Sequence, residues 1–247
     1  MKEYGLIGFP LSHSFSKRYF DDKFEKEQTT NASFSLFEVE HIDAFPALIS
    51  NHKDLQGVCI TIPHKKNVLP YLHKMDKAVQ EVGACNCVRI KDGQLFGYNT
   101  DIIGFRASFE KHLKPHHKKA LILGTGGASL GVEYVLKQLG IEYLVVSRQE
   151  NLAINTINYT AITPELMKEY TVVINCTPLG TFPNIDSYPT LPYESITAAH
   201  YFFDLVYNPA ETKFLSLAKD KGATIQNGYE MLVLQAEENW RIWNDLI

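Results

Sequence analysis

The sequence lacks the features of a membrane-spanning or nucleic-acid-binding chain. It has no run of about 18 apolar residues, so we expect no membrane span. Its 24 lysines and arginines are outnumbered by 28 acidic residues, giving a net charge of -4. That balance is too acidic for a dedicated nucleic-acid binder. The 247 residues are 45% hydrophobic, which excludes a mainly disordered chain and is enough for one or two folded domains.

Cysteine is also scarce. The four cysteines are Cys59, Cys85, Cys87 and Cys176. The spacing of Cys85 and Cys87 is not the Cys-x-x-Cys of zinc or redox sites, and in a strand both thiols would share one face. We expect them to be small apolar fillers and expect no metal site. Reduced thiols and the absence of a signal-peptide-like stretch predict a cytoplasmic protein.

The first half alternates strand-like and helix-like segments. Pro63 suits the first position of a helix, which would place Lys65 in the first turn, at the positive end of the helix dipole. The alternation of strands and helices, with one pair of strands joined by a short turn, predicts a mainly parallel sheet with one antiparallel hairpin. The expected strands are 4–8, 34–39, 56–62, 87–90 and 94–97, the last two joined by a turn at 92–93, and the expected helices are 14–27 and 41–50.

A second alternating unit follows a basic stretch, 111–119, that we expect to be a solvated loop. The final segment, 229–247, is rich in helix formers. The chain is therefore predicted to be of the α/β class. The expected strands of this half are 120–123, 143–146, 172–175, 201–204 and 223–225.

A glycine turn follows the first strand of this second half. Gly124 would permit a tight turn, and Gly126 would let the backbone approach a pyrophosphate. The helix that begins near Ala128 would direct free N–H groups at the anion. Ser129 stands at the third glycine position of the usual pattern, so the match is incomplete. The turn favours dinucleotide binding over an ordinary strand-to-helix turn.

The next strand ends at Ser147 and Arg148, without the acidic residue that usually holds the ribose hydroxyls of NAD. An arginine can pair with a 2′-phosphate through its planar guanidinium. Arg148 therefore favours NADP, and the alternative is an ordinary surface arginine.

Polar residues stand where a parallel sheet binds ligands, at the carboxyl ends of the first-half strands. Ser14 and Ser16 follow the first strand, although one of them could merely cap a helix. Thr61 and Lys65 follow the third strand, and Asn86 precedes the fourth. Residues 99–101 close the half.

Taken together, these segments resemble the shikimate dehydrogenase family. The resemblance extends from residue 4 to near the C-terminus, with the motifs in family order. They are SHSFS at 12–16, TIPHK at 61–65, GACN at 83–86, NTD at 99–101, GTGGAS at 124–129, NCTPLG at 175–180, DLVYNP at 204–209 and GYEMLVLQ at 228–235.

The resemblance implies reversible NADPH-dependent reduction of 3-dehydroshikimate to shikimate, in the pathway to aromatic amino acids, by a monomer or homodimer. It implies two α/β domains with a cleft between them: a mainly parallel substrate-binding domain, 1–100 with 229–247, and a Rossmann-like NADP-binding domain, 101–228. The matching residues are the catalytic pair Lys65 and Asp101, the substrate contacts Ser14, Ser16, Thr61, Asn86, Tyr207 and Gln235, and the cofactor contacts Gly124, Thr125, Gly126, Gly127, Ala128, Arg148, Leu205 and Gly228.

The residue types fit this chemistry independently. Hydride transfer to a carbonyl creates an alkoxide-like oxygen that needs a proton or a positive charge, and Lys65 can supply both. We interpret Asp101 mainly as the residue that orients Lys65 and as its partner in a proton relay. The alternative is an ordinary surface ion pair. The neutral Ser, Thr, Asn and Gln side chains can bind the hydroxyls and carboxylate of a small polyol acid.

The chain departs from the family pattern at two cysteines. Cys59 stands where the family usually has asparagine, which removes an amide near the substrate, and Cys87 replaces the usual threonine. Two other functions stay open at this point. One is a quinate/shikimate dehydrogenase that uses NAD, and the other is a cofactor-binding sensor without turnover.

Overall fold

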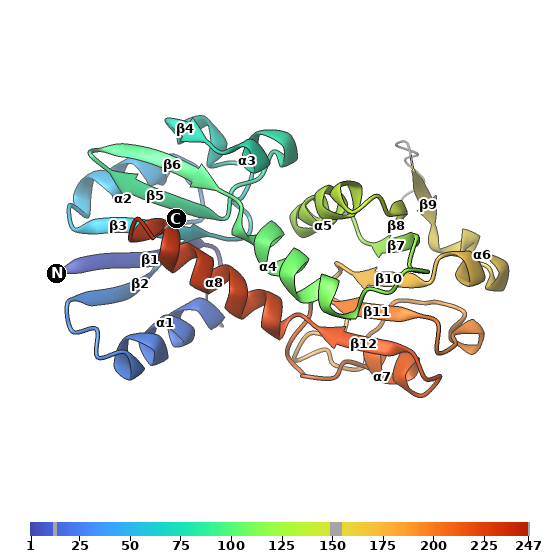
Figure 1. Ribbon diagram of the computed structural model, residues 1–247. Helices are drawn as coiled ribbons and strands as arrows, with labels where there is room; N and C mark the ends of the chain where they lie inside the picture. The colour runs from blue at the N-terminus through green and yellow to red at the C-terminus, as the bar shows by residue number, and fades with distance from the viewer. Residues whose placement is uncertain (12–13, 149–154, 247) are drawn as a thin grey trace. The chain divides into compact units, whose positions relative to one another are not determined.

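The computed structural model describes residues 1–11, 14–148 and 155–246, and these fall into two compact units (Figure 1). The first unit holds Met1–Ile103 and Gln235–Ile247, and the second holds Gly104–Leu234. The divisions lie inside helices α4 (Thr100–Phe109) and α8 (Tyr229–Trp243). The boundaries predicted from the sequence, after residues 100 and 228, lie a few residues earlier.

The first unit has a mixed six-stranded sheet in the order β2-β1-β3-β5-β6-β4. Parallel pairing of β1 with β2 and β3 and the antiparallel β5–β6 hairpin confirm the predicted arrangement. Asp92 and Gly93 both have positive φ, as a two-residue hairpin turn requires. The strands are β1 (Lys2–Gly8), β2 (Ala32–Glu38), β3 (Leu55–Ile60), β4 (Lys74–Met75), β5 (Cys87–Lys91) and β6 (Gln94–Tyr98).

Helices cover both faces of this sheet. Helices α1 (Phe15–Lys26) and α8 pack on one face, where Phe20 and Trp243 contact Tyr4 and its neighbours. Helices α2 (Phe45–Asn51) and α3 (Lys77–Val82) supply apolar side chains to the other face. The short 3-10 helices of this unit are Ile42–Ala44 and Leu69–Tyr71. Because helices cover both faces, the sheet forms the buried centre of the unit.

The helix predicted to begin at Pro63 is absent. Residues 62–68 form a series of turns, and Lys65 is therefore not in the first turn of a helix. The physical reason is a long-range backbone hydrogen bond: the Cys85 N–H donates to the Lys65 carbonyl over 2.8 Å. That carbonyl is thus taken by a neighbouring segment rather than by the next helical turn.

The prediction that Cys85 and Cys87 share one strand face is also wrong. Strand β5 begins only at Cys87, so the alternation of a strand does not reach back to Cys85. Cys87 packs with Tyr4 and Cys59, whereas Cys85 packs with the apolar cluster on the opposite side of the sheet. Both are buried free thiols, as expected.

The second unit has a six-stranded sheet in the order β12-β11-β10-β7-β8-β9, with every neighbouring pair parallel. This is the doubly wound order of a dinucleotide-binding fold and confirms the predicted Rossmann-like topology. Strands β10 and β11 have the predicted bounds. The strands are β7 (Lys119–Leu123), β8 (Glu142–Ser147), β9 (Thr156–Asn158), β10 (Val172–Asn175), β11 (Tyr201–Asp204) and β12 (Thr224–Asn227).

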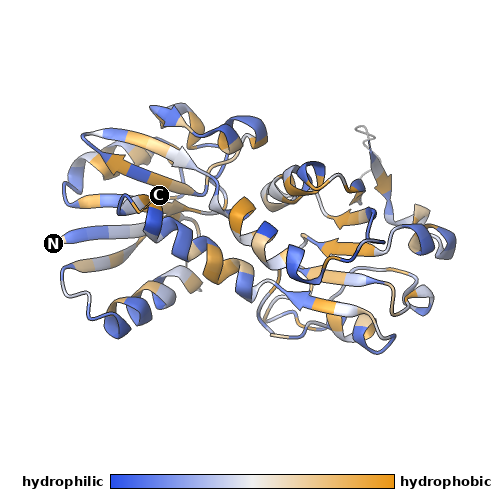
Figure 2. Ribbon diagram, in the orientation of Figure 1, coloured by the Kyte–Doolittle hydropathy of each residue, from blue (hydrophilic) through white to orange (hydrophobic). Residues whose placement is uncertain are grey.

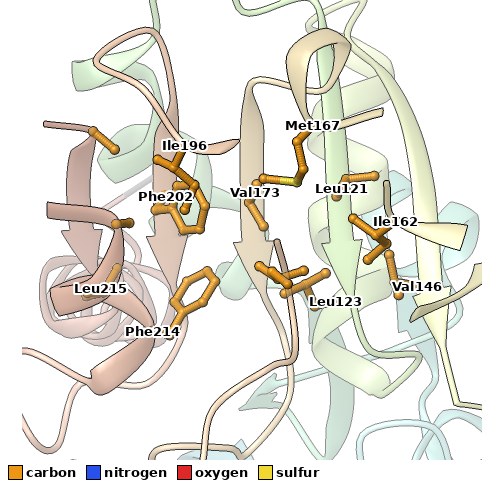
Figure 3. Close-up of a cluster of buried hydrophobic side chains, with 13 residues drawn as sticks. Leu121, Leu123, Val146, Ile162, Met167, Val173, Ile196, Phe202, Phe214 and Leu215 are labelled. Atoms are coloured by element: carbon orange, nitrogen blue, oxygen red, sulfur yellow. The ribbon is translucent and has the colours of Figure 1, made fainter. Parts of the chain in front are cut away.

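One large cluster of the second unit's core lies on one face of this sheet. Figure 3 shows Leu121 of β7, Val173 of β10 and Phe202 of β11 on the same face of the sheet, with Phe214 next to Phe202 and Met167 next to Leu121. Strand β10 is mostly hydrophobic in Figure 2, as expected for a central parallel strand covered on both sides. The helices are α5 (Gly127–Gln138), α6 (Pro164–Glu169) and α7 (Lys213–Lys219), with 3-10 helices at Glu110–His112, Tyr159–Ala161 and Tyr193–Ser195.

The basic stretch 111–119 is only partly a solvated loop. His117 is buried, and its ring stacks on Tyr201. Its Nδ1 accepts a hydrogen bond from the Lys114 N–H, so its Nε2 donates to the Ala199 carbonyl. A histidine whose two ring nitrogens both form hydrogen bonds with the backbone can be buried in its neutral form. The number of basic residues in a segment does not reveal such partners.

A buried carboxylate joins the ends of β10 and β11. Asp204 accepts hydrogen bonds from Asn175 Nδ2 (2.9 Å), the Val206 N–H (3.0 Å) and the Thr212 hydroxyl (2.6 Å). Asn175 in turn accepts from Thr177, which fixes the loop after β10. Burial dominates over these hydrogen bonds and raises the pKa of Asp204 to about 6.

Asp204 should therefore make the protein more stable as the pH falls from 7 to 4. An unfolded aspartate has a pKa of about 4, so between these values the folded state binds more protons than the unfolded state. We expect the free energy of unfolding of the wild type, relative to that of Asp204→Asn, to rise by about 2–3 kcal/mol over this range. Urea unfolding of both proteins at several pH values measures the difference, and a difference independent of pH would contradict the assignment.

Candidate active site

The candidate residues of the first unit meet at one edge of its sheet. Strands β1, β3 and β6 run in the same direction and end at this edge. Ser14 follows β1, Thr61 and Lys65 follow β3, and Asp101 follows β6. Asn86 directly precedes β5, which is antiparallel to β3, and its carbonyl accepts from the Ile60 N–H. Sheet topology thus gathers side chains from four separate segments of the sequence.

Lys65 and Asp101 form an ion pair. The distance from Lys65 Nζ to Asp101 Oδ2 is 2.7 Å. The two side chains are only 20% and 18% exposed, which distinguishes the pair from an ordinary surface salt bridge. Asp101 lies in the first turn of α4, while the backbone of Lys65 is tied to Cys85. The backbone contacts of both partners thus hold the ion pair at the sheet edge.

A glycine allows Thr61 to lie over the end of β1. The Thr61 N–H donates to the Ile7 carbonyl over 2.9 Å. A Cβ atom added at Gly8 would lie 2.4 Å from Thr61 Cγ2, far closer than two carbon atoms can approach. The side chain of Thr61 can therefore lie at this edge only because residue 8 is glycine.

The two serines begin helix α1. Ser14 caps it, since its Oγ accepts from the Lys17 N–H over 3.3 Å. This capping role leaves the hydroxyl hydrogen of Ser14 able to donate to a ligand. Ser16 is half-buried in the first turn. Residues 12 and 13 of the same motif lie outside the described residues.

A buried network of polar side chains lies beside the ion pair. Asn86 accepts from the Thr100 N–H over 2.7 Å and donates to the Thr100 hydroxyl over 3.0 Å. Thr100 contacts Asn239 of α8, which also contacts Gln235. Thr100 lies in the NTD motif, but neither Thr100 nor Asn239 is among the site residues predicted from the sequence. The available signal is the four-residue spacing of Gln235 and Asn239, which puts two amides on the side of α8 whose other buried residues, Ala236, Ile242 and Trp243, are apolar.

The glycine turn of the second unit fits a dinucleotide phosphate. Gly124 has a φ of 102°, and a Cβ there would lie 2.9 Å from Thr177 Cγ2. A Cβ added at Gly126 or Gly127 would meet nothing within 4 Å, so the space beside the turn is open. Helix α5 begins at Gly127 and has no side-chain hydrogen bond at its N-cap. Its first N–H groups can therefore bind an anion, with Thr125 and Ala128 beside them.

The other candidate cofactor residues also lie in the second unit. Arg148 is exposed just after β8, and its positive charge acts on Tyr159, whose pKa is raised by burial. Gly228 packs against Leu205, because an added Cβ would lie 2.2 Å from the Leu205 carbonyl oxygen. Tyr207 follows β11 in this same unit and is half-buried, which raises its pKa. Residues 149–154, which follow Arg148, lie outside the described residues.

Two classes of site are not found in residues 1–11, 14–148 and 155–246. These residues contain no group of three or more His, Cys, Asp or Glu side chains that could hold a metal ion. They also contain no helix with the length and apolar character needed to cross a membrane.

Comparisons with known proteins agree on one family. Residues 6–88 match the family model described as the shikimate dehydrogenase substrate binding domain. A relative from Caldicellulosiruptor bescii named shikimate dehydrogenase (NADP(+)) is 35% identical over 263 residues, which cover 100% of this chain and 91% of that protein. A relative of the same name from Methanosphaera stadtmanae is 32% identical and covers 97% of this chain and 90% of that protein.

Solved structures agree. Shikimate dehydrogenase from Aquifex aeolicus is 30% identical and superimposes with a TM-score of 0.87, covering 99% of this chain and 93% of that chain. Identity above 30% over nearly the whole length of two curated relatives, together with this shared fold, leaves one conclusion: the chain belongs to the shikimate dehydrogenase family.

Proposed function

We propose that this protein reversibly reduces 3-dehydroshikimate to shikimate with NADPH, in the biosynthesis of aromatic amino acids. The observation that carries the proposal is the half-buried Lys65–Asp101 ion pair, which lies at a sheet edge among neutral hydrogen-bonding side chains. Curated relatives named shikimate dehydrogenase (NADP(+)) support the activity and the cofactor. A family member from Thermus thermophilus, 29% identical with a TM-score of 0.87 and covering 100% of this chain and 95% of that chain, was solved with NADP(H) and shikimate.

The two units take different roles in this proposal. The first unit binds the substrate and the second binds the dinucleotide, which supplies the hydride when it is bound. The phosphates would be held by Gly124, Thr125, Gly126, Gly127 and Ala128, the 2′-phosphate by Arg148, and the remainder by Leu205 and Gly228. The open space beside Gly126 and the uncapped start of α5 support this assignment.

Lys65 acts as the general acid in the proposed reaction. Its ammonium donates a proton to the substrate oxygen on which negative charge develops, and in the reverse direction its amine takes that proton back. Asp101, 2.7 Å from Lys65 Nζ, keeps the ammonium in place. A proton at a fixed position is already available when the carbonyl carbon accepts hydride, so little reorganisation is needed.

Neutral side chains hold the substrate in the proposal. In the first unit, the hydroxyls of Ser14, Ser16 and Thr61 and the amides of Asn86 and Gln235 can bind ring hydroxyls and a carboxylate without adding charge. Tyr207 of the second unit stays a predicted substrate contact. Because these side chains are uncharged, they place no second charge beside the Lys65 ammonium. The described geometry of Ser14, Thr61 and Asn86 around the ends of β1 and β3 supports this arrangement.

The activity is tested by following absorbance at 340 nm with each pair of shikimate or quinate and NADP+ or NAD+. We expect turnover with shikimate and NADP+. Absence of turnover with shikimate and both cofactors would reject the proposal and would leave a cofactor-binding sensor. Preference for quinate with NAD+ would favour the other alternative, which the names of the curated relatives do not favour.

Lys65→Ala should lower kcat for shikimate oxidation by at least about 100-fold, because general acid–base catalysis typically contributes this much or more. The thermal unfolding midpoint should change little, since Lys65 lies in a partly exposed turn. The matched control is Lys66→Ala, which removes the neighbouring exposed lysine and should keep kcat within about twofold of the wild-type value. An unchanged kcat in Lys65→Ala would disprove the role of Lys65.

Arg148→Ala should raise the KM for NADP+ by about tenfold and leave the KM for NAD+ unchanged. The variant loses a charge-assisted contact with the 2′-phosphate, a group that NAD+ does not have. Arg106→Ala, which removes another exposed arginine of the second unit, is the matched control. Equal changes in the two KM values would show that Arg148 does not discriminate between the cofactors.

A further inference from the structure

Asn239 of α8 is a polar side chain buried in full. It is 0% exposed, and its amide contacts three other residues. Its Oδ1 accepts from the Thr100 hydroxyl over 2.6 Å. Its Nδ2 donates to Cys59 Sγ over 3.2 Å and to Gln235 Oε1 over 3.3 Å. Both hydrogens and the oxygen of this amide are thus used inside the protein.

These contacts determine how two proposed substrate contacts are oriented. The Thr100 hydroxyl has one hydrogen, and its shortest contact gives that hydrogen to Asn239. Thr100 Oγ1 is then an acceptor for Asn86 Nδ2, while Asn86 Oδ1 accepts the Thr100 N–H. The amide of Asn86 can therefore point only one way. At the other end, the hydrogen bond from Asn239 fixes which side of the Gln235 amide carries the oxygen.

The same amide lies against Cys59 of β3. The thiol of Cys59 can accept only a weak hydrogen bond. Cys59 is 4% exposed and packs in the apolar cluster beneath α8. Nδ2 of Asn239, 3.2 Å from Cys59 Sγ, brings an amide to the place where β3 lacks one.

We propose that Asn239 is a positioning residue for the substrate, and that it supplies from helix α8 the amide that strand β3 lacks at Cys59. The inference rests on the proposed function, because the residues it positions are the proposed contacts Asn86 and Gln235. We therefore predict that the effects of substitutions at positions 59 and 239 on shikimate binding are coupled. One amide side chain is required at one of the two positions, and either position can carry it.

The first test is Asn239→Ala. We expect the KM for shikimate to rise at least tenfold, with kcat and the KM for NADP+ within about threefold of the wild type. Alanine suits a helix interior, so the variant should fold. The rise in unfolding temperature that saturating shikimate gives the wild type should shrink in the variant when both are measured without cofactor. A shikimate KM within twofold of the wild type, or an equal rise in both KM values, would overturn the proposal.

The decisive test moves the amide side chain from position 239 of α8 to position 59 of β3. The double variant Cys59→Asn with Asn239→Ala should recover most of the lost shikimate affinity, whereas Cys59→Asn alone should impair folding or affinity, since it crowds two amides into one buried site. The matched control is the double variant Cys59→Ala with Asn239→Ala, which carries no amide at either position. Its affinity for shikimate should stay as low as that of Asn239→Ala. No recovery in the first double variant, or equal recovery in the control, would overturn the proposal.

Turnover and binding of shikimate by the wild-type protein distinguish a failure of this inference from a failure of the proposed function. A wild-type protein that neither turns over nor binds shikimate rejects the proposed function and, with it, the inference. A wild-type protein that turns over shikimate while Asn239→Ala keeps its shikimate KM rejects the role of Asn239 alone.

Discussion

The hydrogen bond from the Cys85 N–H to the Lys65 carbonyl is the constraint on which the candidate active site depends. In this hydrogen bond the Lys65 carbonyl accepts from Cys85 instead of from a residue one helical turn later in the chain. The bond also holds the turn after β3 against the segment before β5. A lysine side chain has four rotatable bonds, and fixing its backbone removes only part of that freedom. Asp101, in the first turn of α4, restricts the remainder through the ion pair. Two separate backbone elements thus determine where one ammonium group lies.

Full use of hydrogen-bonding groups explains why so many polar side chains can be buried here. A buried donor or acceptor without a partner costs about 1–3 kcal/mol. Asn86, Thr100 and Asn239 satisfy one another, and Asn175, Asp204 and Thr212 do the same at the ends of β10 and β11 in the second unit. The network around Asp204 joins the ends of β10 and β11, and the network around Asn239 joins the segment before β5, the start of α4 and the middle of α8. Such networks orient their members, and orientation is what a binding site requires.

The networks of the two units differ in charge. The network around Asn239 is neutral, so its geometry does not change with pH in the physiological range. The network around Asp204 contains a carboxylate whose pKa is raised to about 6 by burial. Hydrogen bonds from Asn175, Val206 and Thr212 favour the charged form and offset part of the cost of burial. The loop after β10 therefore depends on a buried carboxylate, whereas the hydrogen bonds around Asn239 involve no carboxylate.

The sequence by itself determined the strands with continuous apolar runs, such as β10 and β11, because such runs are stable only inside a covered parallel sheet. It also determined the family and the glycine turn, since glycine at 124 is required by local backbone geometry. Only the tertiary structure decided the path of residues 62–68, the burial of His117 and the place of Asn239. Each of these depends on a partner far away in the chain: Cys85 for Lys65, Ala199 for His117, and Cys59, 180 residues away, for Asn239. Local patterns report on neighbours in sequence, and hydrogen bonds between distant segments leave no periodic signal by which they could be found.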